Sequence, residues 1–423
     1  MIMLFIAFVA FLLLGLPVFI AMAGSAMAVV AWDGIPLGVV AQRMISGVQS
    51  FPLLAVLLFT LAGSLMNESG ISDRLFAFTR AIVGHIRGGL AQTAVIGNIF
   101  LSGISGSSVA DCAATARVFV PQLTRAGYGQ GFAAALSASV ATLGPIIPPS
   151  ILMVIYAWQA NISLGDLFWA GVIPGLVMAA SMMIATGIIA ARRGYPKDDA
   201  FSGARLWAAF KHAIWALLMP VLILSGFRAG VFTATEIAGV AALYALIVGK
   251  FIYGTLKWSM LPRILLATAK ETAVILVIVG AAAPFSWILG IEEAPRLIAS
   301  AVKQLTDQPW VILLLLNIVL LILGMFMETI AIMIILVPIL IPLLTAFGID
   351  LTHFGIVLLV NLVIGQLTPP VGVLLFVSSS VSRTPLAMIM REITPFLIAL
   401  LVTLLLLTYL PSLSLWLPHV LNH

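Results

Sequence analysis

Two short stretches of this sequence combine glycine with a Pro-Pro pair inside an apolar segment. They read Leu143-Gly-Pro-Ile-Ile-Pro-Pro149, within residues 130–160, and Ile364-Gly-Gln-Leu-Thr-Pro-Pro370, within residues 352–382. Proline has no backbone N–H and clashes with the preceding turn, so each pair interrupts a helix and frees several carbonyl oxygens. The stretches therefore predict two broken helices that line a cavity, with a simple kink satisfied by neighbouring helices as the alternative.

The composition indicates that these helices lie in a membrane. Of the 423 residues, 62% are hydrophobic and 8% are charged, whereas soluble domains carry about 25% charged residues. A soluble enzyme, a nucleic-acid-binding protein and a disordered scaffold are thereby excluded. The chain has a single cysteine, Cys112, and five scattered histidines, and it has no Walker A motif. We therefore expect an all-α polytopic protein in the lipid bilayer, with no disulfide, no cofactor and no ATP hydrolysis.

A comparison of the chain with itself reveals an internal repeat. A shift of 221 residues aligns, without a gap, Gly103/Gly324, Pro121/Pro342, Gly127/Gly348, Gly144/Gly365, Pro148/Pro369, Pro149/Pro370 and Pro174/Pro395. An odd number of predicted crossings separates the corresponding spans 50–67 and 271–290, so the two halves are inserted upside down relative to each other. Inverted repeats with interrupted helices are typical of secondary transporters, which bind substrate and coupling ions at the breaks.

Each half is predicted to contain a span, a short polar arm, a re-entrant helical hairpin, a broken helix and another span. The uncharged N-terminal stretch indicates one long tilted span, kinked near Pro17. The predicted regions are 1–49, an N-terminal scaffold span and an amphipathic segment; 50–191, the first repeat, with hairpin 88–122 and broken helix 130–160; 192–270, central scaffold spans and cytoplasmic loops; 271–417, the second repeat, with hairpin 309–346 and broken helix 352–382; and 418–423, a C-terminal tail.

The basic residues predict the orientation. If residues 192–211 are cytoplasmic, as the positive-inside rule requires, a count of crossings places 68–87, 117–125, 250–271 and 383–392 on the same side. These five loops hold sixteen of the twenty Lys and Arg residues. The count gives a cytoplasmic N-terminus and a periplasmic C-terminus, and one miscounted span near the N-terminus would reverse that end alone.

Isolated carboxylates occupy the tips of both predicted hairpins. The first tip, Ser102-Gly-Ile-Ser-Gly-Ser-Ser-Val-Ala-Asp111, offers hydroxyls and carbonyls, which are hard oxygen ligands for an alkali cation. The second tip, Gly324-Met-Phe-Met-Glu-Thr-Ile-Ala331, contains Glu328. An ionised carboxylate in apolar surroundings must be paired or bound to a cation. The two acids therefore suit two sodium sites or a proton relay, and a helix N-cap role is the alternative for Asp111.

The tips and breaks together give the candidate binding residues. For sodium, the only metal expected, they are Ser102, Gly103, Ser105, Gly106, Ser107, Asp111, Gly144, Ile147, Gly324, Met327, Glu328, Thr329, Gly365 and Thr368. Since neither the tips nor the breaks contain Lys or Arg, an anionic substrate would be held by half-helix N-termini, hydroxyls and bound cations. The candidate substrate-binding residues are Ser107, Ser108, Pro148, Pro149, Thr329, Pro369 and Pro370.

Two further motifs have competing explanations. Gly230-Val-Phe-Thr-Ala-Thr-Glu236 is either a further site or a capping box closed by Thr233 and Glu236. The Gly-x-Ser-Gly motif at residues 103–106 would also suit an intramembrane serine protease with Ser105 as nucleophile. That chemistry needs a histidine base within hydrogen-bond reach, for which His353 is the candidate, and it leaves the repeat unexplained.

The motifs also resemble those of a known family. Gly106-Ser-Ser-Val-Ala-Asp111, Val120-Pro-Gln-Leu-Thr-Arg-Ala-Gly-Tyr128, the first break through Ser150, Gly230–Glu236 and Gln366-Leu-Thr-Pro-Pro-Val-Gly372 resemble the large membrane (M) subunit of tripartite ATP-independent periplasmic (TRAP) transporters. The resemblance covers nearly the whole chain. Two positions depart from the family pattern: Ala234 replaces a frequent proline, and Glu328 stands where aspartate is frequent, which could alter cation affinity.

The resemblance implies a function and two partners. It implies sodium-coupled uptake of an organic acid anion, such as sialic acid or a dicarboxylate, across the bacterial inner membrane by an elevator movement of an ion-transporter-like fold. It also implies a small four-helix membrane subunit and a periplasmic substrate-binding protein. The alternative within transport is a stand-alone sodium symporter of the related divalent-anion type. The sequence leaves the substrate and the sodium stoichiometry open.

Overall fold

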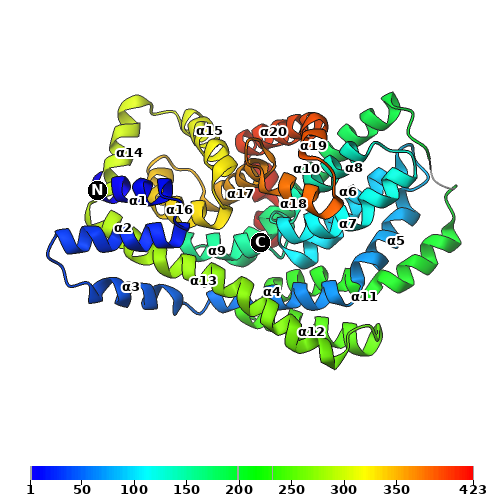
Figure 1. Cartoon of the computed structure of the whole chain (residues 1–423), viewed down its shortest axis with the longest axis horizontal. Coiled ribbons are helices and arrows are strands. Elements are labelled where there is room, and N and C mark those ends of the chain that lie inside the picture. Colours follow the sequence, from blue (N-terminus) through cyan, green and yellow to red (C-terminus); the bar gives the residue numbers. More distant parts are fainter. Residues whose placement is uncertain (1, 198–199, 231, 423) are drawn as a thin grey trace.

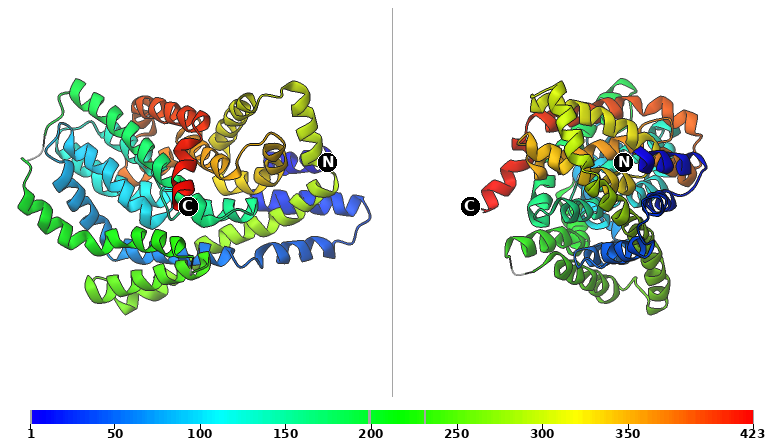
Figure 2. Two further views of the ribbon diagram at one scale, coloured as in Figure 1. Left: turned by 180° about the vertical axis from the view of Figure 1, so that it is seen from behind. Right: turned by 90° about the vertical axis from the view of Figure 1, so that its left-hand side faces the viewer.

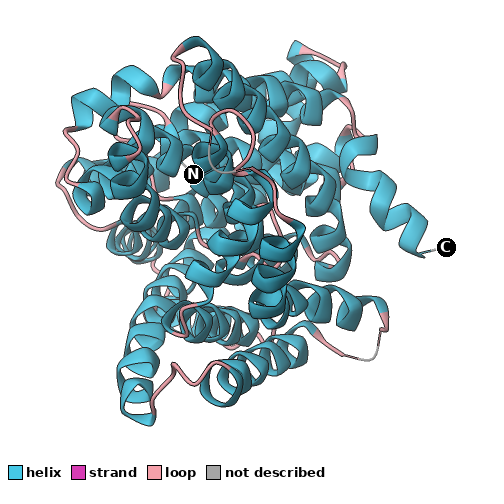
Figure 3. Ribbon diagram, turned by 90° about the vertical axis from the view of Figure 1, so that its right-hand side faces the viewer, coloured by secondary structure: helices cyan, strands magenta, loops and turns pink. Residues whose placement is uncertain are grey.

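The computed structural model describes residues 2–197, 200–230 and 232–422, and its regular elements in these ranges are all helices (Figure 1, Figure 3). Outside the helices, the described residues contain one isolated bridge, between Arg87 and Lys197. Six helices are long and apolar enough to cross a membrane, or up to eight if each bent helix pair forms one span. The predicted all-α, multi-pass membrane architecture is therefore confirmed.

The order of the helices confirms the repeat. The first half consists of α4 (Leu53–Glu68), α5 (Ile71–Val83), α6 (Gly89–Ser105), α7 (Ser108–Arg125), α8 (Gln130–Val140), α9 (Ile151–Ala160) and α10 (Leu164–Arg192). The second half consists of α13 (Leu261–Ile291), α14 (Ala294–Leu305), α15 (Pro309–Phe326), α16 (Thr329–Ala346), α17 (Leu351–Leu367), α18 (Val373–Ser382), α19 (Leu386–Glu392) and α20 (Thr394–Tyr409). A shift of 221 residues places both ends of α7 on the ends of α16.

Both hairpins and both broken helices form where the sequence predicts them. Helices α6 and α7 form the first hairpin, and α15 and α16 form the second. The first broken helix is α8, extended by the 3-10 turn η1 (Ala141–Leu143), followed by α9. The second is α17 followed by α18. The Pro-Pro pairs lie in the breaks, and both Pro148-Pro149 and Pro369-Pro370 are cis.

The two hairpins lie in different halves of the molecule. In Figure 1 the α6/α7 pair lies on the right of the molecule and the α15/α16 pair on the left, with α9, α17 and α18 of the broken helices between them and α8 on the right beside α6. Helix α13 extends along the lower side of this assembly, where α4 and α12 (Ala234–Ile247) accompany it. The remaining scaffold helix is α11 (Gly203–Arg228), and the short turns η2 (Val248–Ile252) and η3 (Trp258–Met260) follow α12.

Three segment boundaries differ from the sequence-based prediction. The N-terminal stretch is not one kinked span, because α1 (Ile2–Leu13) and α2 (Val18–Trp32) pack against each other as separate helices, followed by α3 (Gly38–Val48). Helix α13 begins ten residues before the predicted start of the second repeat at 271. The last span ends at Tyr409, because α21 (Ser412–Asn422) begins after Pro411; α21 contacts α10 while its end projects from the molecule (Figure 2).

Contacts join four of the five loops that carry most of the basic residues, and the fifth, 117–125, is followed by Tyr128, which contacts loop 192–211. The contacts that join them are Arg74 over the Tyr253 ring (3.9 Å), Glu68 with Arg263 (3.8 Å), the Arg87–Lys197 bridge, Tyr128 Oη to Pro196 O (3.4 Å) and Arg193 with Glu392 (2.7 Å). Hydrogen bonds to Glu392 raise the pKa of Arg193 above its ordinary value. The structure thus places these loops together, as the count of crossings requires; which side of the membrane they face stays a prediction.

A buried polar network holds the second hairpin to its broken helix and to the last span. Asn361 Nδ2 on α17 donates to Asn317 Oδ1 on α15 at 2.7 Å, and Asn317 Nδ2 donates to Thr408 Oγ1 on α20 at 2.9 Å. These three side chains are nearly fully buried. A polar group left without a partner there costs about 1–3 kcal/mol, so the network fixes how the three helices pack.

We predict that Asn361→Leu lowers the melting temperature of the purified protein more than the double variant Asn317→Leu/Asn361→Leu does. The single change leaves Asn317 Oδ1 buried without a donor, at a cost of about 1–3 kcal/mol, whereas replacing both partners by apolar groups removes that unpaired atom. Thermal unfolding in detergent measures the effect. A double variant that is clearly less stable than the single one would contradict the network.

Candidate functional site

The tip of the first hairpin is a tight two-residue turn between α6 and α7. Gly106 ends α6 in the left-handed conformation (φ 61), which favours glycine. Ser107 is the N-cap of α7, and its hydroxyl accepts from the backbone N–H of Ala110. The alternative N-cap role for Asp111 is therefore wrong, because Asp111 lies one turn further into the helix.

Asp111 is fully buried at this tip. Ser102 Oγ donates to its Oδ2 at 3.1 Å, and Ser105 Oγ donates to its Oδ1. Burial of an unpaired carboxylate is strongly unfavourable unless the charge is compensated. The two hydroxyls satisfy hydrogen-bonding capacity without supplying a positive charge, so this pocket of oxygen atoms has the chemistry of a cation site.

The first break packs directly onto this tip. A Cβ on Gly144 would lie 2.7 Å from Asp111 Oδ2 and 3.1 Å from the backbone of Ser107 and Ser108. A Cβ on Gly106 would lie 2.6 Å from the carbonyl oxygen of Pro149. The glycines therefore allow the break and the tip to approach each other closely. The Pro149 carbonyl oxygen, which lies in the break, is next to Gly106 of the hairpin tip.

The second tip has a different polar group. Glu328 is the N-cap of α16, and its Oε2 accepts from Ala331 N at 3.0 Å. Behind the tip, a Cβ on Gly365 would lie 2.7 Å from the backbone of Gly324. Hairpin and break thus meet through a pair of glycines in the second repeat.

The repeat relates Glu328 to Ser107 and places Ile332 at the position of Asp111. The two acids are therefore not equivalent, although the sequence analysis treated them as a pair. Asp111 lies inside the first hairpin, one turn into α7, whereas Glu328 is the N-cap of α16 at the second tip itself. Two matching sodium sites do not follow from the repeat alone.

Gln366 connects the two tips. Ser108 Oγ donates to its Oε1 at 2.7 Å, and its Nε2 donates to Thr329 Oγ1 at 2.6 Å. Ser108 and Thr329 are the first residues of α7 and α16 and correspond to each other in the repeat. The sequence analysis missed Gln366. The available signal was asymmetry, because the corresponding residue of the first break is Pro145, which has no side-chain donor.

A central cavity of about 540 Å³ lies at the meeting point of the two tips. Ser105, Gly106, Ser107, Ser108, Glu328 and Thr329 are the predicted site residues that line it. Residues of α4 and α13 complete its wall, among them Thr60, Ser64, Asn67 and Glu271, none of which the sequence analysis singled out. The corresponding spans of both repeats thus contribute to one cavity.

Other predicted residues lie away from this cavity. Ile147 packs against Gly175 of α10, and Thr368 Oγ1 donates to Ile364 O of its own helix at 2.7 Å. Met327 forms the C-cap of α15. Pro148 and Pro149 are buried beside the first hairpin, whereas Pro370 is exposed. In the second break Pro369 is half-buried and only Pro370 is exposed, whereas both prolines of the first break are buried.

Comparison with known proteins identifies the family. Residues 5–413 match the family described as "Tripartite ATP-independent periplasmic transporter, DctM component". The chain belongs to this family. It is 42% identical over 371 residues to the C4-dicarboxylate TRAP transporter large permease protein DctM of Pseudomonas aeruginosa, a match that covers 88% of this chain and 87% of that protein. It is 38% identical over 380 residues to the sialic acid TRAP transporter large permease protein SiaM of Vibrio cholerae, covering 90% and 89%.

Solved structures share the fold. The Alcanivorax borkumensis YdaH transporter superposes with a TM-score of 0.66 at 16% identity, covering 88% of each chain. Its structure is described as having an unusual topology. Together with the family match, this identifies a membrane transport protein of the TRAP large permease type and not an enzyme.

The protease alternative fails on geometry. Ser105 Oγ donates to Asp111, while the ring of His353 contacts Ser414 Oγ at 2.8 Å and Thr408 O at 3.3 Å. Nucleophile and base thus have other partners on different helices. The second disputed motif contains a capping box formed by Thr233 and Glu236; its residue 231 lies outside the described residues.

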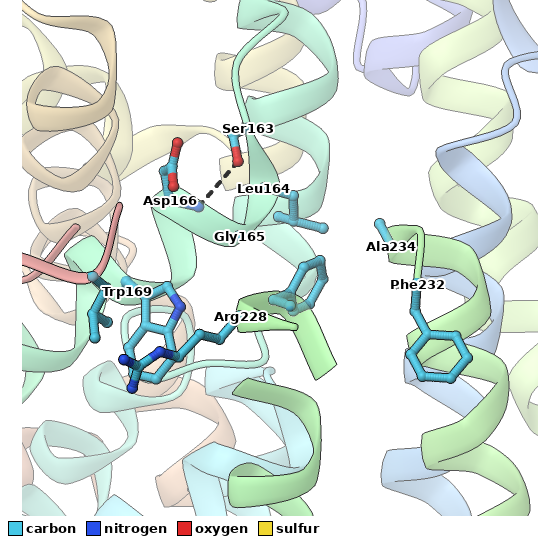
Figure 4. A pocket seen from close by; sticks show the side chains of 10 residues that line it. Ser163, Leu164, Gly165, Asp166, Trp169, Arg228, Phe232 and Ala234 are labelled. Carbon is cyan, nitrogen blue, oxygen red and sulfur yellow. Dashed lines mark hydrogen bonds between the residues drawn. The ribbon is translucent and has the colours of Figure 1, made fainter. Parts of the chain in front are cut away.

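A second pocket, of about 480 Å³, lies between the starts of α10 and α12 and the end of α11 (Figure 4). The backbone N–H of Asp166 donates to Ser163 Oγ at 3.2 Å, which is an ordinary helix N-cap. The wall of this second pocket contains none of the predicted site residues and none of the hairpin-tip residues. The central cavity is therefore the candidate transport site of this TRAP permease.

We predict that Gly365→Ala destabilises the protein and impairs transport. The new Cβ would lie 2.7 Å from the Gly324 backbone, and such overpacking costs about 1–3 kcal/mol. Gly290→Ala on α13 is the matched control, because nothing lies within 4 Å of its Cβ. Thermal unfolding should separate the two variants, and equal melting temperatures would contradict the close contact between hairpin and break.

Proposed function

We propose that this TRAP permease carries out sodium-coupled uptake of an organic acid anion across the bacterial inner membrane. The observation that carries the proposal is Asp111, fully buried among the hydroxyls of Ser102 and Ser105 at a hairpin tip next to the central cavity. Burying this carboxylate as an anion requires a compensating positive charge. A sodium ion bound by hydroxyl, carboxylate and carbonyl oxygens would supply it.

The cation site would consist of the first tip and the first break. Ser102, Ser105 and Asp111 contribute side-chain oxygens, and the carbonyl of Pro149 lies beside Gly106. Glu328 at the second tip is the candidate for a further cation. Ser102, Ser105, Asp111 and Glu328 are among the sodium-binding candidates proposed from the sequence, whereas Pro149 was proposed there for the substrate.

The transported anion would bind in the central cavity. Since two similar permeases are named for C4-dicarboxylates and for sialic acid, we propose a carboxylate substrate of this kind. Hairpins and broken helices would move together against the scaffold as an elevator, because each break is packed onto a tip by glycine contacts too close for a side chain.

We further propose two partners. The family description names a tripartite periplasmic system, which supports a small membrane subunit beside this chain and a periplasmic substrate-binding protein that delivers the anion. Co-purification of a small integral membrane protein from the native host would support the first partner.

We predict that Asp111→Asn abolishes sodium-driven uptake of succinate or N-acetylneuraminate in proteoliposomes containing all three components. The amide retains the shape and an acceptor oxygen but removes the charge that would bind sodium. Asp33→Asn, at an exposed acid, is the control and should transport normally. Unchanged uptake and sodium dependence in the Asp111 variant would overturn the proposed cation site.

A second prediction needs no partner. Sodium should raise the melting temperature of the purified chain relative to potassium, because a ligand at 100 times its Kd stabilises the folded state by about 2.7 kcal/mol. The double variant Ser102→Ala/Ser105→Ala should lose most of this sodium-specific shift. A shift of the same size in wild type and variant would place sodium elsewhere.

A further inference from the structure

We infer that Gln366 is a specificity-determining residue of the anion site, where Gln366 and Thr329 supply two neutral hydrogen-bond donors that hold a carboxylate of the transported anion. This inference rests on the proposed function and assigns the anion to the second hairpin tip. The cation would then lie at the first tip, around Asp111.

The side chain of Gln366 is buried at the cavity and held in a fixed orientation. It lies in the last turn of α17, directly before the second break, and it is 7% exposed while lining the central cavity. Its amide is held at both ends, by Ser108 Oγ at 2.7 Å and by Thr329 Oγ1 at 2.6 Å. A buried side chain fixed at both ends is oriented before any ligand arrives, which reduces the entropy lost on binding.

Gln366 and Thr329 each have one hydrogen-bond donor that their mutual contacts leave unused. A hydroxyl has one O–H donor, and an amide nitrogen has two N–H donors. Ser108 uses its only O–H on Gln366. Gln366 uses one N–H on Thr329 and retains the other, and Thr329 accepts that bond and retains its own O–H. Two free donors therefore lie side by side, which matches the two acceptor oxygens of a carboxylate.

The charged residues that line the cavity are acidic. The described lining residues include the acids Glu271 and Glu328 and contain neither lysine nor arginine. An anion in this cavity therefore depends on neutral donors and on bound cations. Glu328 accepts from Ala331 N in the backbone of α16. The lining also offers Ser64 and Asn67 on α4 as neutral polar groups, but Gln366 and Thr329 are the pair already joined to each other by a hydrogen bond at a hairpin tip.

The repeat shows why one tip and not both would hold the carboxylate. Ser108 and Thr329 correspond to each other, but the first break has Pro145 where the second has Gln366. Proline offers no donor, so the pair of free donors exists only at the second tip. The asymmetry separates an anion side from a cation side in a cavity built from two similar halves.

The test uses Gln366→Met and Thr329→Val in the complete reconstituted transporter, with succinate and N-acetylneuraminate as probes. Each variant removes one donor to a charged group, which is expected to raise KM by about 10-fold to about 100-fold. For Gln366→Met, the maximal rate and the sodium concentration for half-maximal uptake should stay within about two-fold of wild type, since Gln366 is not among the proposed cation ligands. Gln159→Met is the matched control, because Gln159 donates to Ile334 O away from the cavity.

The outcomes separate this inference from the proposed function. A wild-type KM in Gln366→Met would overturn the inference while sodium-driven uptake stands, and a wild-type KM in Thr329→Val would overturn the paired donors. If wild type accumulates neither probe with sodium, both the proposed function and the inference fall. Should Gln366→Met fold poorly, Thr329→Val carries the test, because it leaves the bond between Ser108 and Gln366 in place.

Discussion

A polar group in apolar surroundings must find a partner, and most of this structure follows from that requirement. The two Pro-Pro breaks free backbone carbonyls that no helix can satisfy. Each break is packed against a hairpin tip, through Gly144 and Gly106 in the first repeat and through Gly324 and Gly365 in the second. At each tip the second helix of the hairpin begins, and its first backbone N–H groups need caps. Ser107 caps α7 and Glu328 caps α16.

The close contacts also bear on the elevator movement that we propose. A hairpin that touches a break at distances too short for a Cβ cannot slide along it without losing that fit. Each tip and its break therefore behave as one unit, and Gln366 joins the two units across the cavity. Spans such as α4 and α13, which line the same cavity from outside, are the surfaces against which these units would move.

The two repeats have the same arrangement of helices, but they differ at the polar residues of the candidate site. Helices α7 and α16 correspond end to end, yet Asp111 corresponds to an isoleucine, Glu328 to a serine and Gln366 to a proline. A symmetric cavity would treat its two halves alike. Because a cation and an anion need opposite partners, Asp111 at the first tip suits the proposed cation, and Gln366 at the second tip suits the proposed anion.

Much of this architecture could be predicted from the sequence, because glycine and proline act locally. The Pro-Pro pairs interrupt helices, whereas single prolines such as Pro121 and Pro174 lie inside helices. The spacing of both residue types revealed the repeat, the hairpins and the broken helices. The scarcity of charge likewise singled out Asp111. A kink near Pro17 was predicted, but the full break between α1 and α2 was not, since Pro17 permits either and only packing selects between them. The role of Gln366 depends on contacts with residues 258 and 37 positions away. The sequence by itself determined where helices break and which acids are isolated, whereas only the tertiary structure decided which groups meet, because hydrogen bonds between distant residues exist only after the helices have packed.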